Sequence, residues 1–226
     1  INHPMTTCYV TSRAGWFAMV RDNPNQVKFL SDQLLEVSTK HGFKNFELAA
    51  LFFKHWLNLQ DNKLVNKTID AMKKILDDYI VTKTVLNRTV FLIFFAKACA
   101  IAGQQRLGLD IINECIALGE KTGELWFQAE AWRIKGELII SGNNRLGEKD
   151  DLSEALLCFK DAYKTAQEQG GKMWELRAAM SLAKFYASQT QPEVGRELLQ
   201  ETYDWFTEGF ETKELQQARM LLNSLK

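Results

Sequence analysis

The sequence predicts an all-α protein in which about five helix hairpins stack into a superhelix and one last helix caps the array. Two observations lead to this fold class. The chain is rich in Leu, Ala, Glu, Lys and Gln but has only 3 prolines in 226 residues, which favours long helices over many short strands. Small residues also recur at steps of about 40 positions, as expected when one helical unit is repeated along a chain.

The repeat is clearest around Gly136. Trp132 and Gly136 fit the first helix of a hairpin, and Ala155 and Phe159 fit the second. The small residues would let two antiparallel helices approach closely, while the aromatic residues fill the space beside that contact. This spacing is typical of tetratricopeptide repeats. The same frame assigns four further residues to the position of Gly136, namely Gly15, Trp56, Ala96 and Ala183.

This frame makes residues 1–226 one repeat domain. Its elements are expected, in order, as hairpins at about 4–41, 45–79, 83–122, 124–169 and 172–207, followed by a cap at 213–225. Within them, helices are expected at about 4–21, 24–41, 46–60, 62–79, 83–102, 104–122, 126–141, 152–169, 174–188, 192–207 and 213–225.

Proline and glycine set the ends of these helices. Pro4 opens the first helix. Pro24 and Pro192 each lie three residues before the small residue of a second helix, where a first helical turn tolerates proline. Glycines are expected to close the second helices of four hairpins as C-terminal caps, at Gly42, Gly123, Gly170 and Gly209.

The fourth hairpin has a longer connection than its neighbours. Its two small residues are 19 positions apart, whereas the corresponding step is 12 in other hairpins. The extra residues fall in the polar stretch 142–151, where we expect a surface loop. Gly142 and Gly147 are spaced as in a phosphate-binding loop. Glu148 stands at the lysine position, however, and the stretch follows a helix, so we expect no nucleotide there.

Composition disfavours several classes of function. The 28 basic and 28 acidic residues give zero net charge, so the chain lacks the bulk attraction that drives binding to nucleic acids or anionic membranes. The longest apolar stretch, 90–102, contains Lys97 and is shorter than the roughly 20 residues of a spanning helix.

The four cysteines are far apart, so we expect buried free thiols in the cytoplasm, with no metal site and no cofactor. Because the chain begins with Ile1, we expect a piece of a longer protein.

Several stretches resemble a known group of proteins. They are ELWFQAEAWRIKGEL at 124–138, ALLCFKDA at 155–162 and WELRAAMSLA at 174–183. These are similar to the C-terminal tetratricopeptide region of large bacterial signalling ATPases, and residues 198–222 are similar to its closing segment. In that group the repeats follow a nucleotide-binding ATPase module, often with a class III nucleotidyl cyclase domain or the DNA-binding domain of a transcriptional regulator. The resemblance implies that this chain comes from such a signalling protein.

Binding residues are expected on the first helices, which line the concave groove of stacked hairpins. The candidates are Tyr9, Trp16, Phe53, Lys97, Glu130, Arg133, Glu137, Arg177 and Lys184. The amino-terminal half of this groove is apolar and aromatic, and the other half is charged. Two interpretations of the charged half stay open. The three charged residues of helix 126–141 can pair along one helix face. Alternatively, the lysines and Arg177 can present cations to an acidic peptide or a ligand carboxylate.

The sequence contains no recognisable catalytic constellation. Its histidines have no nucleophile or carboxylate at motif spacing, and His55, in an apolar run, is expected to be a hydrogen-bonded core residue. The leading hypothesis is a non-enzymatic scaffold that binds a protein segment, another domain of its parent protein or a small effector. It would pass this occupancy to an attached signalling module or transcriptional regulator. The alternative is the regulatory C-terminal region of an adenylate or guanylate cyclase, or of an ATPase, whose catalytic domain lies upstream.

The last helix must cover an apolar face without exposing one of its own. Inward positions are expected for Leu215, Ala218, Leu221 and Leu222, and water-facing positions for Lys213, Glu214, Gln217 and Arg219. The aromatic residues before the helix are too apolar to be left exposed together, so most should lie under it; they are Tyr203, Trp205, Phe206 and Phe210.

Overall fold

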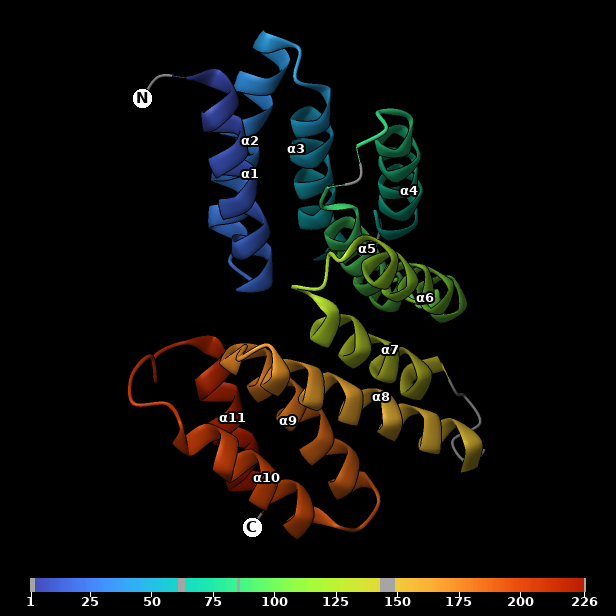
Figure 1. Ribbon diagram of the computed structural model, residues 1–226, viewed down its shortest axis with the longest axis vertical. Coiled ribbons are helices and arrows are strands. Elements are labelled where there is room, and N and C mark those ends of the chain that lie inside the picture. Colours follow the sequence, from blue (N-terminus) through green and yellow to red (C-terminus); the bar gives the residue numbers. More distant parts are fainter. Residues whose placement is uncertain (1–2, 61–63, 85, 143–148, 226) are drawn as a thin grey trace. The chain divides into compact units, whose positions relative to one another are not determined.

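The computed structural model describes residues 3–60, 64–84, 86–142 and 149–225. Over these residues the chain is all-α, as expected, and contains no strand. The elements are α1 (Pro4–Val20), α2 (Pro24–His41), α3 (Lys44–Leu57), η1 (Asn58–Gln60), α4 (Val65–Val81), α5 (Arg88–Ile101), α6 (Gln105–Thr122), α7 (Gln128–Gly142), α8 (Lys149–Glu168), α9 (Lys172–Ser188), α10 (Pro192–Asp204) and α11 (Lys213–Ser224) (Figure 1).

The chain divides into two compact units, Ile1–Gln104 and Gln105–Lys226. The first holds α1 to α5 and the second holds α6 to α11. The expected third hairpin, 83–122, has one helix in each unit. Because the boundary falls between these two helices, a single repeat domain and a tetratricopeptide superhelix stay predictions.

The helix starts of the first unit follow from local chemistry. The ring nitrogen of His3 accepts a hydrogen bond from the backbone N–H of Thr6, and the side chain of Asn23 accepts one from the N–H of Gln26. Proline occupies the first turn of both α1 and α2, as the sequence predicts. Gly42 ends α2 at a positive φ of 68°, where glycine avoids the steric cost of a side chain.

Aromatic side chains fill the core of the first unit. The centre of the Trp16 ring lies 4.7 Å from the centre of the Phe53 ring and 4.8 Å from that of the Phe91 ring, and both contacts are edge-on. A Cβ atom at Gly15 would lie 2.3 Å from the Phe53 ring, so the ring occupies the space that a side chain on α1 would need. Phe53 therefore packs inward, onto the neighbouring first helix.

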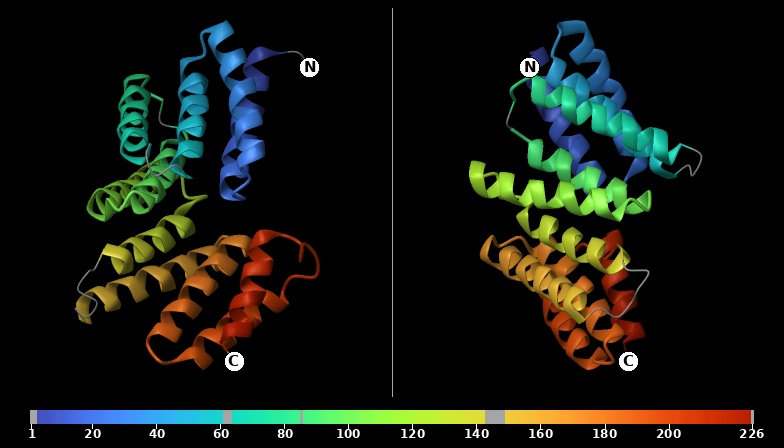
Figure 2. Two further views of the ribbon diagram at one scale, coloured as in Figure 1. Left: turned by 180° about the vertical axis from the view of Figure 1, so that it is seen from behind. Right: turned by 90° about the vertical axis from the view of Figure 1, so that its right-hand side faces the viewer.

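In the second unit α7 pairs with α8 and α9 pairs with α10 (Figure 2). A Cβ atom at Gly136 would lie 2.6 Å from the Phe159 ring of the partner helix. One at Gly195 would lie 2.7 Å from the Cα atom of Ala183. The small residues picked out by the frame therefore mark the close approaches of both hairpins, as expected.

The closing segment departs from expectation in three places. The last turn of α10 ends at Asp204 rather than Thr207, so Gly209 lies in the connection to α11 and does not cap α10. Trp205 is 57% exposed and Phe210 is 44% exposed, and neither is covered by α11. Glu214 faces a neighbouring helix instead of water. The inward positions of Leu215, Ala218 and Leu222 are confirmed, while Leu221 is partly buried.

Two further expectations concern the connection in the fourth hairpin and the membrane. The expected loop lies mostly at 143–148, outside the described residues; Gly142 ends α7 and Lys149 begins α8. None of the described helices is long and apolar enough to cross a membrane.

Candidate functional site

Four of the sequence-predicted groove residues meet in one network. Glu130, Arg133 and Glu137 lie on α7, and Arg177 lies on α9. The Nε and Nη2 atoms of Arg133 donate to the two carboxylate oxygens of Glu130, at 2.7 and 2.9 Å. Its Nη1 atom donates to Glu137. The pairing along one helix face is therefore confirmed.

The network continues across two more helices. The Nη1 atom of Arg177 lies 3.5 Å from Glu130 Oε1, and its Nη2 atom donates to Glu214 Oε1 of α11 at 2.5 Å. The guanidinium also stacks on Trp174, 5.2 Å from the ring centre. We call the series Glu137, Arg133, Glu130, Arg177 and Glu214 the charge ladder. It joins the first helices of two hairpins to the capping helix.

The charge ladder is mostly buried. The Glu130 side chain is 3% exposed, and the arginine side chains are 12% and 11% exposed. Burial alone would lower the pKa of Arg133, but the adjacent carboxylates of Glu130 and Glu137 outweigh it and hold this pKa above its usual value. Three carboxylates face two guanidiniums. An acidic ligand that bound Arg177 would have to displace Glu130 or Glu214, since both already contact its guanidinium.

The remaining groove candidates do not join this network. Trp16 and Phe53 are 2% and 0% exposed, which corrects the expectation that they face a groove: the close approach of α1 and α3 draws both rings into the core. Tyr9 is half exposed, with the Arg13 guanidinium 4.9 Å from its ring centre. The Nζ atom of Lys97 lies 5.5 Å from the centre of the Phe94 ring. Lys184 is exposed on α9.

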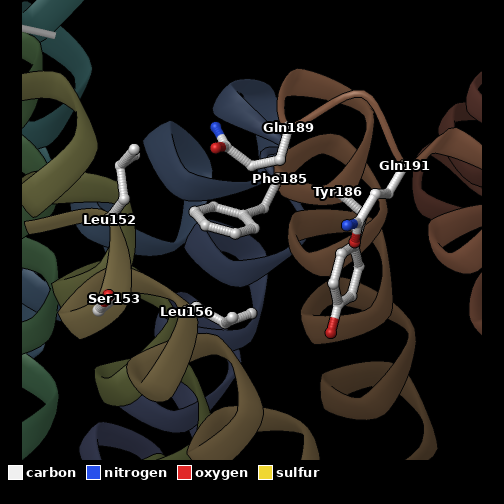
Figure 3. A pocket seen from close by; sticks show the side chains of 7 residues that line it. All are labelled: Leu152, Ser153, Leu156, Phe185, Tyr186, Gln189 and Gln191. Atoms are coloured by element: carbon white, nitrogen blue, oxygen red, sulfur yellow. The ribbon is translucent and has the colours of Figure 1, made fainter. Parts of the chain in front are cut away.

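A second feature of the second unit is an open hollow between α8 and α9, which we call the α8–α9 hollow. Its volume is about 270 Å³. It is lined by Leu152, Ser153, Leu156, Phe185, Tyr186, Gln189 and Gln191. In Figure 3 the Phe185 ring points from α9 toward Leu152 and Leu156 of α8. The amide side chains of Gln189 and Gln191 extend from the end of α9 and the connection that follows it.

Sequence reasoning missed this hollow. Its apolar residues follow the helical period of α8 and α9 and look like ordinary core positions. The one sequence feature near it is the longer connection of the fourth hairpin. The structure begins α8 at Lys149, three residues before the expected start, so the additional helical residues directly precede Leu152 and Ser153.

The four cysteines are buried, His55 is partly buried, and their surroundings favour the uncharged form of each. All four cysteines are buried free thiols, as expected, and burial raises the pKa of Cys99 and Cys115 to about 12. Burial lowers the pKa of His55, and its Nδ1 atom has no hydrogen-bond partner in the described part of the chain. The expectation of a hydrogen-bonded core histidine is therefore wrong for this nitrogen. No group of three potential metal ligands occurs among the described residues.

Comparisons with known proteins give one resemblance and no family. No family model matches the chain. The chain is similar to a protein from Rhizobium meliloti (strain 1021) whose description is "Uncharacterized protein R02095", with 23% identity over 171 residues. The match covers 73% of this chain and 15% of that protein. The similar region is thus a small part of a much longer polypeptide.

Proposed function

We propose that this chain is a helical-hairpin scaffold of tetratricopeptide type that binds a protein segment and has no catalytic role of its own. In a longer bacterial protein it would act as the sensor or regulatory part of a signalling protein or transcriptional regulator. The observation that carries the proposal is the α8–α9 hollow. It combines an apolar floor with amide groups, whereas the space beside Gly136 in the same unit is filled by the Phe159 ring.

The chemistry of the hollow suits an extended peptide. Leu152, Leu156 and Phe185 can receive one apolar side chain, because a hollow of about 270 Å³ lies just below the usual size range of small-molecule pockets. The amides of Gln189 and Gln191 offer both donors and acceptors, which are the groups that a peptide backbone requires. An apolar anchor held beside hydrogen-bonding groups is a common arrangement at peptide-binding surfaces.

The charge ladder has a supporting role in this proposal. Its arginines are already paired within the unit, so it is better suited to fix α7, α9 and α11 in position than to bind a separate acidic ligand. A fixed set of first helices would hold the α9 side of the hollow in place before a partner arrives, which reduces the ordering cost of binding.

The alternative is that the chain regulates an enzyme to which it is covalently attached. One observation favours this version: the Rhizobium protein is more than six times as long as the matching region. In this case the chain would be the regulatory C-terminal region of a nucleotidyl cyclase or ATPase, and occupancy of the hollow would alter the activity of an upstream catalytic domain.

A display-library selection of random peptides on the 226-residue protein tests the proposal. Selected peptides should share an apolar anchor. They should lose at least about tenfold in affinity for Ser153→Trp, because the indole would fill the hollow. Leu157→Trp is the matched control, since Leu157 is 60% exposed on the same helix and does not line the hollow. Equal binding to the two variants, or no enriched peptide at all, would refute binding in the hollow.

A further inference from the structure

The connection between α10 and α11 presents aromatic side chains to solvent. It covers residues 205–212 and forms a wide turn at the edge of the second unit (Figure 1). Trp205 is 57% exposed and Phe210 is 44% exposed. Both stand on a segment that the sequence alone would place under the capping helix. Large apolar side chains that stay exposed on one short connection often mark an interaction site.

The turn is built so that these two rings point outward. Tyr203 and Phe206, which flank Trp205, pack against the apolar cluster under α11 and anchor the segment. Gly209 adopts a positive φ of 77°, and its carbonyl accepts hydrogen bonds from the N–H and the hydroxyl of Thr212 at 2.9 and 2.7 Å. The exposure of Trp205 and Phe210 therefore comes from a defined turn and not from a frayed helix end.

Carboxylates lie close to the exposed rings along the chain. Glu201 and Asp204 are exposed on the last turn of α10, and Glu208 and Glu211 are exposed in the connection itself. Within the described ranges no basic side chain forms an ion pair with any of the four. Asp204 accepts a hydrogen bond from the uncharged amide of Gln200, at 2.7 Å. No ion pair within the described residues thus neutralises these four carboxylates, although the chain as a whole carries no net charge.

One contact shows how a cation uses this surface. The Nζ atom of Lys172 lies 5.3 Å from the centre of the Trp205 ring, within the range of a cation–π interaction. The same ammonium pairs with the buried carboxylate of Glu175 at 2.7 Å. Because more than half of Trp205 is exposed, the indole can accept a second cation from outside.

We propose that this acidic aromatic turn, with Trp205 and Phe210 at its centre, docks a basic protein segment in which lysine or arginine residues alternate with apolar ones. The basic side chains would pair with the four carboxylates and stack on Trp205, and the apolar ones would cover Phe210. This charge complementarity selects a basic partner and disfavours nucleic acids and anionic membranes. The inference rests on the proposed scaffold function and gives the chemistry of one partner, at a surface separate from the α8–α9 hollow.

Fluorescence anisotropy with two labelled synthetic peptides tests the inference. One peptide alternates lysine with leucine, and the other has glutamate in place of lysine. We expect the 226-residue protein to bind the basic peptide and not the acidic one, with affinity falling as salt is raised. The double variants Trp205→Ala/Phe210→Ala and Glu208→Gln/Glu211→Gln should each weaken binding at least about tenfold.

Matched variants separate docking from general effects. Phe29→Ala removes a 60% exposed phenylalanine of the first unit, and Glu36→Gln removes an exposed carboxylate there; both should bind like the wild type. Circular dichroism melts should show that the double variants fold, since all four substituted side chains are exposed. Unchanged binding by either double variant would overturn the inference, as would equal losses in the control variants.

Two further readouts fix the occupant and separate the two proposals. Light scattering that showed a dimer dispersed by Trp205→Ala/Phe210→Ala would assign the surface to a second copy, and preferential binding to anionic vesicles would assign it to a membrane; either result overturns the inference. If Ser153→Trp abolishes binding of the basic peptide and the turn variants do not, the hollow is the site and only this inference fails. The opposite pattern supports the turn, and the hollow is then judged by the library-selected peptides alone.

Discussion

Replacing Gly195 by alanine tests the close approach of α9 and α10. The new Cβ atom would lie 2.7 Å from the Cα atom and 2.9 Å from the carbonyl oxygen of Ala183. Both are backbone atoms, so no side-chain rotation relieves the overlap. The helices would have to separate by about 0.7 Å at this point to restore an ordinary contact.

Two effects of opposite sign decide the result. Alanine is favoured over glycine inside a helix by about 1 kcal/mol. Overpacking of a tight core typically costs about 1–3 kcal/mol and more where the backbone must move. Because the new Cβ atom would meet backbone atoms of Ala183, we expect the second effect to exceed the first. The predicted net loss for Gly195→Ala is about 2 kcal/mol, or about 4–8 °C in the midpoint of a thermal melt.

Circular dichroism melts of Gly195→Ala and Gly142→Ala provide the comparison. A Cβ atom at Gly142 would meet its nearest neighbour, Gln105 Cβ, at an ordinary 3.4 Å. That variant gains the helix preference of alanine without the overlap, so its midpoint should be equal to or above that of the wild type. A Gly195→Ala protein that melts at or above the wild-type midpoint would show that the two helices are not held at this distance.

Three further predictions follow from the packing and the charges. Deletion of α11 should cost about 3–6 kcal/mol, since two large buried side chains are lost and the faces they cover become exposed; an unchanged calorimetric midpoint would contradict this. In urea denaturation, Glu130→Gln should lower the free energy of unfolding by about 3–5 kcal/mol, because the Glu130 carboxylate pairs with two arginines. Glu137→Gln should lower it by less than about 1 kcal/mol, because the Glu137 side chain is half exposed. Cys99 and Cys115 should resist a thiol reagent until the protein unfolds. Their folded pKa values, about 12, exceed the unfolded ones. The contribution of these two thiols to the free energy of unfolding should therefore be fully present below about pH 9 and be lost as the pH rises further. Thermal melts across this pH range would show the loss.

The sequence predicts helices and hairpin contacts well for a physical reason. Helix ends depend on nearby residues, and Pro24, Pro192 and Gly42 act within one turn of their own positions. Close approach within a hairpin depends on a fixed spacing between two small residues, which the frame around Gly136 captures. Both kinds of information are local in the chain, so spacing alone recovers them.

Contacts between hairpins are less predictable. Phe53 fits a groove position by its register, yet its ring packs onto Gly15 of α1. Glu214 reaches Arg177 across 37 residues and lies on the capping helix, outside the repeat frame. The exposure of Trp205 depends on where α10 stops, and helix ends without proline or glycine are set by packing that spacing does not encode.

The charge ladder limits how an array of this kind can grow by duplication. Glu130 and Arg177 occupy the same position in consecutive hairpins, six residues before Gly136 and Ala183, and Glu214 follows on the next helix. Negative and positive side chains thus alternate from one repeat to the next. Copying the last hairpin once would place guanidinium against guanidinium in a mostly buried setting, at a high electrostatic cost. Copying two hairpins together restores the alternation. Lengthening in pairs therefore preserves the ladder, and a single added hairpin needs a compensating change of charge.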